Sequence, residues 1–157
     1  MEKSTNPSPM FDRRTFLKNG SLGALFLVAR PLSVEATPTS AMEAIHKVTG
    51  GKKLQEGNVN IDLAEIAENG GTVPVKVSVD SPMTEEDHIT AVHIYTDGNP
   101  FPEVASYFFG PHNGQAYMSI RLRLLKTQSV IAVAETSSGE AYIGSKAIKV
   151  TIGGCGG

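Results

Sequence analysis

The sequence VPVKVSVD, residues 73–80, decides the fold class. Its valines alternate with Pro, Lys, Ser and Asp, which is the period of two that a strand shows when one of its faces is buried. The same period recurs in ITAVHIYTD (89–97), EVASYFF (103–109), AYMSIRLRLLK (116–126), SVIAVAET (129–136) and AYIGSKAIKVTI (141–152). Turn residues separate these segments, as in Asp97-Gly98-Asn99-Pro100 and the tight Ser137-Ser138-Gly139 connection. Six or seven short strands with no helix between them predict an all-β, immunoglobulin-like antiparallel β-sandwich.

One short helix is expected before the strands. AMEAIHKVTGGKKLQEG (41–57) places Met42, Ile45 and Val48 on one stripe, and Gly50-Gly51 is a typical stop signal. Val59 and Ile61 then begin the alternating pattern, and LAEIAENGG (63–71) allows one helical turn. We therefore expect a helical segment at 37–57, a β-sandwich at 58–152 and a flexible arm at 153–157.

The segment MSIRLRLL (118–125) predicts a strand with two different faces. Met118, Ile120, Leu122 and Leu124 lie on one face, and Tyr117, Ser119, Arg121 and Arg123 lie on the other. The arginines are expected to be solvated on an outward face. The alternative is that they line an interface with a partner.

The composition excludes several classes of protein. With 157 residues, 40% hydrophobic and 19% charged, the chain has the make-up of one ordinary globular domain. Its net charge of −2 provides no basic stripe, so nucleic acid is not an expected partner.

The first 36 residues have the pattern of an export signal. Arg13-Arg14 and Lys18 precede a short apolar run from Leu22 to Ala29, and Ala36 ends a plausible cleavage site. The run is shorter than the roughly 20 apolar residues that a membrane-spanning helix needs, so no membrane anchor is expected. This pattern predicts export by the twin-arginine route and a periplasmic location. An amphipathic N-terminal helix is the alternative.

Ordinary catalytic signatures are missing from the sequence. His46, His88, His93 and His112 match no recognised metal-ligand spacing, and His88 falls among Glu85, Glu86 and Asp87 in what we expect to be a solvated turn. We find no phosphate-binding loop, nucleophile elbow or convincing pair of carboxylates. The sequence therefore predicts neither a catalytic residue nor a bound metal.

The C-terminal GGCGG contains the only cysteine, Cys155. Gly153, Gly154, Gly156 and Gly157 surround it with residues that have no side chain to restrict the backbone or to shield the sulfur. An exposed lone thiol in an oxidising compartment is open to uncontrolled oxidation, which favours a chemical use for it. Three uses fit: a disulfide between two scaffold chains, a ligand arm for a metal such as copper, and a covalent handle that presents a bound group to other proteins. The slender glycine flanks favour the handle.

Three segments resemble the SoxY family, the sulfur-carrier subunits of the thiosulfate-oxidising Sox system: IAENGGTVPVKVSV (66–79), YMSIRLRLLKT (117–127) and KVTIGGCGG (149–157). The resemblance implies that Cys155 is the site of covalent sulfur attachment and that the chain carries no cofactor beyond this cargo. It also implies a SoxZ-like β-sandwich subunit as partner. A c-type cytochrome would load Cys155, a dimanganese hydrolase would release sulfate, and in some systems a sulfur dehydrogenase would oxidise the remaining sulfur.

Overall fold

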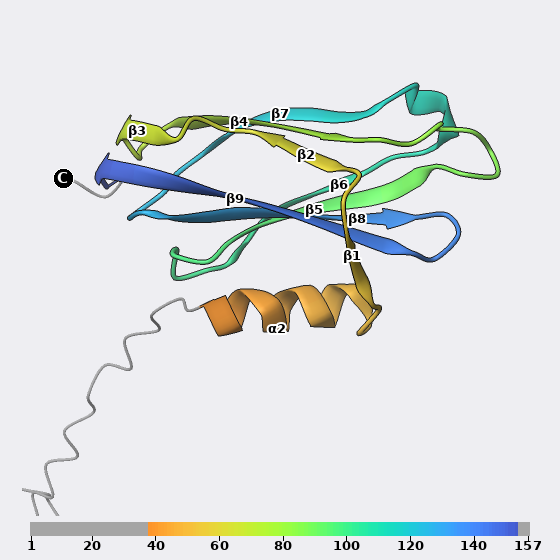
Figure 1. The fold of residues 1–157 in the computed structure, drawn as a ribbon, viewed down its shortest axis with the longest axis horizontal. Coiled ribbons are helices and arrows are strands. Elements are labelled where there is room, and N and C mark those ends of the chain that lie inside the picture. Colours follow the sequence, from red (N-terminus) through yellow and green to blue (C-terminus); the bar gives the residue numbers. More distant parts are fainter. Residues whose placement is uncertain (1–37, 154–157) are drawn as a thin grey trace, which may run out of the picture. The chain divides into compact units, whose positions relative to one another are not determined.

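The alternating segments form the strands of a two-layered sandwich (Figure 1). The computed structural model describes residues 38–153, so the expected export signal with Arg13 and Arg14, and the tail residues Gly154, Cys155, Gly156 and Gly157, lie outside the described residues. One sheet has the order β1-β9-β8-β5-β6, with β3 also paired to β9, and the other has the order β2-β4-β7. The elements are α2 (Pro38–Thr49), β1 (Leu54–Glu56), β2 (Val59–Asp62), β3 (Ile66–Asn69), β4 (Val73–Val79), β5 (Ile89–Thr96), β6 (Glu103–Phe108), the 3-10 turn η1 (Pro111–Asn113), β7 (Ala116–Leu122), β8 (Gln128–Thr136) and β9 (Ala141–Ile152). The predicted β-sandwich is confirmed.

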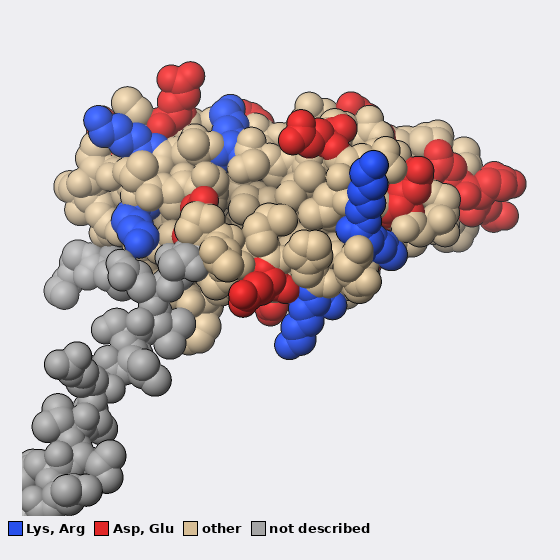
Figure 2. Space-filling view, turned by 60° about the horizontal axis from the view of Figure 1, so that its bottom comes forward, with Lys and Arg blue, Asp and Glu red and all other residues tan. Residues whose placement is uncertain are grey.

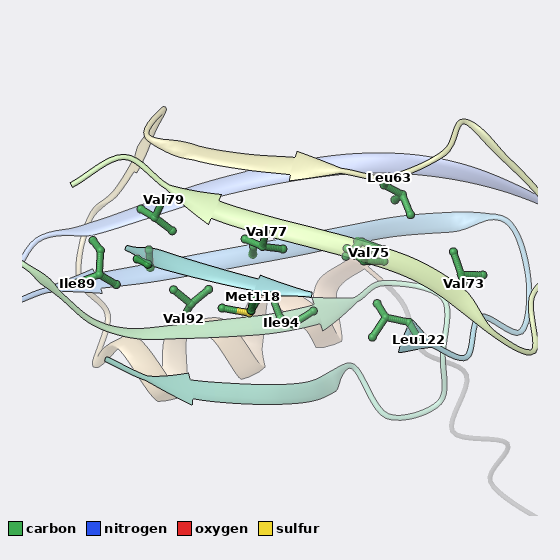
Figure 3. Packing of buried hydrophobic residues seen from close by; sticks show 14 of the residues in the cluster. Leu63, Val73, Val75, Val77, Val79, Ile89, Val92, Ile94, Met118 and Leu122 are labelled. Carbon is green, nitrogen blue, oxygen red and sulfur yellow. The ribbon is translucent and has the colours of Figure 1, made fainter. Parts of the chain in front are cut away.

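The main core lies between the two sheets. All four valines of β4 are buried, and Figure 3 shows Val75 and Val77 among side chains of the facing sheet such as Val92 and Ile94. The predicted inner face of β7 is also confirmed, because Met118 and Leu122 join this cluster. Period-two burial therefore holds the two layers together.

Helix α2 covers the outer face of the larger sheet, where Ala41 and Ile45 pack against Tyr95, Ile131 and Val133. The expected stripe is confirmed only at Ile45, because Met42 and Val48 are 38% and 40% exposed. The buried residues are instead Ala41, Ile45 and Thr49, which lie one helical turn apart on the same face. The Thr49 hydroxyl donates to the Ile45 carbonyl at 2.9 Å. Small side chains allow the helix to lie close to the sheet. Neither helical segment within 38–153 is long and apolar enough to cross a membrane.

Two strands were missed by the sequence analysis. Residues 54–56, placed in the helical segment, form β1, and the expected helical turn within 63–71 is β3. Both strands pair in parallel with β9, so the sandwich is not wholly antiparallel. In both cases the free edge of β9 supplies backbone hydrogen-bond partners, and this outweighs the weak local preference for helix.

The last strand, β9, is paired along both edges. β8 lies along one edge, while β1 and β3 lie at the two ends of the other. Between β1 and β3 the chain passes to the smaller sheet, where it forms β2. A side chain at Gly144 of β9 would meet the Val59 carbonyl oxygen at 2.9 Å and Val59 Cγ1 at 3.0 Å. Gly144 is therefore required for the two layers to approach each other here.

We predict that Gly144→Ala destabilises the fold by about 1–3 kcal/mol, because the added methyl group overpacks the contact with Val59. Gly110→Ala is the matched control, since a side chain there would meet nothing within 4 Å and φ is −146°. Urea unfolding of the three proteins measures the difference. Equal midpoints for the two variants would contradict the close-approach role of Gly144.

Candidate functional site

The end of β9, from which the C-terminal arm continues, is joined to the rest of the sandwich by backbone hydrogen bonds. The Gly70 amide donates to the Ile152 carbonyl at 2.7 Å, and the Gly70 carbonyl accepts from the Leu124 amide at 2.8 Å. Gly70 thus joins the end of β9 to the chain that leaves β7. One residue earlier in β9, the Thr151 hydroxyl donates to the Glu68 carbonyl at 2.8 Å. The last residues of β9 are therefore held from the β3 side.

The connection between β7 and β8, residues 123–127, holds the opposite side. The Val150 amide donates to the Thr127 hydroxyl oxygen at 3.0 Å, which extends the β8–β9 pairing beyond Gln128. The arm therefore starts between two anchored segments.

A side-chain network centred on Asn99 and Gln128 fixes the shape of residues 123–127. Asn99 Nδ2 donates to the Arg123 carbonyl at 2.8 Å, and Asn99 Oδ1 accepts from the Leu125 amide at 3.1 Å and from Gln128 Nε2 at 2.9 Å. Gln128 Oε1 in turn accepts from the Gly98 amide at 2.9 Å. Gln128 is buried, and its amide satisfies backbone groups of two loops. We call this network of Asn99 and Gln128 the brace, because it holds residues 123–127 in place beside Gly153.

The sequence analysis missed this network. The only signal was the turn Asp97-Gly98-Asn99-Pro100, which was used to separate two strands. Asn99 and Gln128 are far apart in sequence, so only the folded topology brings them together.

Gly153 is the one residue of the predicted flexible arm that the structure describes, and it lies against the chain at Leu125. A Cβ built on Gly153 would collide with the Leu125 carbonyl oxygen and lie 3.2 Å from the carbonyl carbon. Glycine is thus needed here for close backbone approach, in addition to any freedom it gives the arm. The other predicted arm residues and Cys155 lie outside the described residues.

The outward face of β7 carries the basic side chains expected there. Arg121 on β7 is exposed, as are Tyr117 on the same face and Arg123, which directly follows the strand. Neither arginine forms an ion pair within residues 38–153. Exposure agrees with the solvated-face expectation and leaves these groups accessible to a partner.

The four histidines do not come together. His46 is exposed on α2, His112 is exposed in η1, and the His88 ring nitrogen Nδ1 lies 2.9 Å from the Thr84 carbonyl oxygen in the loop before β5. Within the described residues, no group of three or more His, Cys, Asp or Glu side chains is placed to hold a metal ion.

His93 is the one buried histidine in the described range. Its Nδ1 lies 2.7 Å from the Ser106 hydroxyl, whereas Nε2 is buried, has no hydrogen-bond partner and stands 3.9 Å from Glu135 Oε2. Lys52 already pairs with Glu135 at 3.1 Å. Burial lowers the pKa of His93, and the nearby carboxylates of Glu135 and Glu103 only partly oppose this effect. Burial likewise raises the pKa of Tyr95, on the same strand, to about 12.

These features define a β-sandwich protein whose final strand is anchored at its end and leads directly into a short cysteine-bearing tail. The chain belongs to the SoxY family, since the family described as "Sulfur oxidation protein SoxY" matches residues 45–155.

Solved structures agree with this assignment. The sulfur carrier protein SoxY from Chlorobium limicola f thiosulfatophilum is 34% identical, with a TM-score of 0.63 over 73% of this chain and 99% of that chain. Superoxide reductase (neelaredoxin) from Ignicoccus hospitalis is 24% identical, with a TM-score of 0.54 over 74% of this chain and 95% of that chain, and this likeness concerns the fold alone. No match was found among curated proteins.

We predict that Gly153→Ala displaces the end of β9 or residues 123–127, and lowers stability by about 1–3 kcal/mol, because the methyl group has no space beside Leu125. Thermal unfolding measures the loss. Gly154→Ala tests whether any added methyl group in the arm has the same effect. A Gly153→Ala protein as stable as wild type would show that the contact with Leu125 is not tight.

The buried His93 predicts acid sensitivity. Because its pKa is lower in the folded state than the unfolded value of 6.5, the unfolded chain binds the proton more readily. The stability contribution is complete above pH 6.5 and is lost as the pH falls through the folded-state pKa. His93→Gln should flatten the unfolding free energy below pH 6.5, and the exposed His112→Gln should not. Equal pH slopes for the wild type and His93→Gln would contradict this role.

Proposed function

We propose that this protein is a periplasmic carrier that holds thiosulfate-derived sulfur covalently on Cys155 and presents it to other enzymes of the Sox system. The observation that carries the proposal is that the family match runs through to Cys155. The similar Chlorobium limicola protein, a sulfur carrier by name, supports it. The anchored root beside Gly153 also supports it, because it gives the thiol a defined starting point on the domain.

The carried chemistry has two steps. First, the Cys155 thiol and thiosulfate form a sulfur–sulfur bond, giving a cysteine S-thiosulfonate, and one proton and two electrons leave, the electrons to a c-type cytochrome. Second, water cleaves the terminal sulfur–sulfur bond, giving sulfate, a proton and a cysteine persulfide. The overall balance needs an external electron acceptor in the first step and only water in the second.

The chain supplies the handle, and its partners supply the catalysis. A dimanganese hydrolase would perform the second step, and a sulfur dehydrogenase, where the system has one, would oxidise the persulfide sulfur. A SoxZ-like β-sandwich subunit would accompany the carrier. Accessible side chains on the outward face of β7, such as Tyr117 and Arg121, are one candidate contact for it.

We predict that intact-mass analysis of the protein from thiosulfate-grown cells detects adducts that a thiol reductant removes. Cys155→Ser should abolish them and thiosulfate-dependent growth, while leaving thermal stability unchanged. A wild-type protein with only free thiol under these conditions would contradict the carrier function.

The two other uses of a terminal cysteine predict different results, which intact-mass analysis and a cuprous-ion titration detect. A scaffold that dimerises through a tail disulfide would show a reducible dimer as its main species and no sulfur adduct. A metal-delivery arm would bind cuprous ion with an affinity that Cys155→Ser removes. The carrier proposal requires neither result.

A further inference from the structure

Three dipeptides within residues 38–153 have a sequence that favours attack on a side-chain carbonyl by the next backbone nitrogen: Asn69-Gly70, Asp97-Gly98 and Asn113-Gly114. The glycine leaves its own nitrogen unshielded, because it has no Cβ. The attack closes a cyclic succinimide, and it requires a glycine amide that is free to turn toward the side chain. The surroundings of each glycine therefore decide where this reaction proceeds in the folded protein.

Two of the three glycines are buried, and their amides are hydrogen-bonded to distant parts of the chain. The Gly70 amide donates to the Ile152 carbonyl at 2.7 Å, and the Gly70 carbonyl accepts from the Leu124 amide at 2.8 Å. The Gly98 amide donates to Gln128 Oε1 at 2.9 Å. Ring closure at either glycine needs a local opening of the sandwich, which costs free energy. The hydrogen bonds that hold the end of β9 and the brace thus protect both dipeptides.

The third glycine, Gly114, is exposed, as is Asn113 at the end of η1. The Gly114 amide makes no hydrogen bond to another segment of residues 38–153. A Cβ built on Gly114 would meet nothing within 4 Å, so the space around this residue is open. The Gly114 nitrogen is therefore able to move without any opening of the two sheets.

The carboxamide carbon is activated in the same way at both asparagines. Asn113 Oδ1 accepts from the Gly110 amide at 2.8 Å. Asn69 Oδ1 accepts from the Gly71 amide at 2.7 Å. Each hydrogen bond stabilises the negative charge that develops on the side-chain oxygen during attack. The two Asn-Gly sites thus differ at the glycine nitrogen and are alike at the side chain.

We propose that Asn113 is a site of spontaneous deamidation in the folded protein, and that the fold suppresses the same reaction at Asn69. The Gly114 nitrogen loses its proton and bonds to Asn113 Cγ, while the Cγ–Nδ2 bond breaks and ammonia carries the proton away. Water then opens the succinimide at either carbonyl, which gives aspartate or isoaspartate. Water is the only co-reactant, and the reaction does not depend on the cargo proposed for Cys155.

The product places a new carboxylate at an end of the molecule that is already acidic. Figure 1 shows the η1 turn at the end of the sandwich away from the end of β9. Figure 2 shows acidic side chains gathered at this end, where the exposed Glu85, Glu86 and Asp87 lie in the loop before β5. Isoaspartate also lengthens the backbone between β6 and β7, which belong to different sheets. The modification therefore falls on the connection between the layers and leaves the end of β9 unchanged.

The test compares the two Asn-Gly sites within one sample of the full-length wild-type protein. The protein is kept in mildly alkaline buffer with and without urea, and peptide mapping by mass spectrometry measures the aspartate and isoaspartate formed at Asn69 and Asn113. In the folded protein, Asn113 should react at least about tenfold faster than Asn69, because Gly70 must first be released by local opening. In urea the two rates should become close to equal, since both sites are then unprotected Asn-Gly dipeptides.

Three outcomes would overturn the proposal. The first is an Asn113 that remains intact in the folded protein while it reacts in urea. The second is an equal rate at Asn69 and Asn113 in the folded protein, which would show that the Gly70 hydrogen bonds give no protection. The third is a rate ratio that urea leaves unchanged, since the flanking residues and not the fold would then set it.

Discussion

The pairing of β9 along both of its edges is the constraint on which the rest of the structure depends. β8 occupies one edge, β1 and β3 share the other, and β2 passes between them only because Gly144 has no side chain. One strand thus joins the first part of the chain to the last and sets the spacing of the two layers. The same strand leads directly to the cysteine-bearing tail, so the fold and the candidate site share one element.

The tail therefore combines a fixed origin with a short terminal segment. Gly70 and the 123–127 connection hold the end of β9 from two sides, and Asn99 and Gln128 hold that connection in turn. Such a brace fixes the point at which the chain leaves the sandwich, beside Leu125.

Much of the fold could be predicted from the sequence, because alternation reports one-sided burial directly. The valines of β4 and the inner face of β7 were placed correctly on that basis. The helix stripe was not, because a sheet can accept small residues such as Ala41 as closely as large ones. β1 and β3 were missed because their partner is a strand roughly eighty residues later, which a local pattern does not report. The cysteine is a prediction that rests on its glycine flanks, whereas the role of Gly153 depends on Leu125, which only the folded chain brings beside it.

The place of β9 in the chain also links synthesis to chemistry. β9 is the last strand to leave the ribosome, yet it lies in the interior of the larger sheet, between β8 on one edge and β1 and β3 on the other. A nascent chain cannot complete that sheet until residue 152 has emerged, and Cys155 follows within three residues. A chain that terminates within β9 therefore lacks the completed sheet as well as Cys155. An early stop within β9 thus cannot produce an intact sandwich that lacks only the cysteine.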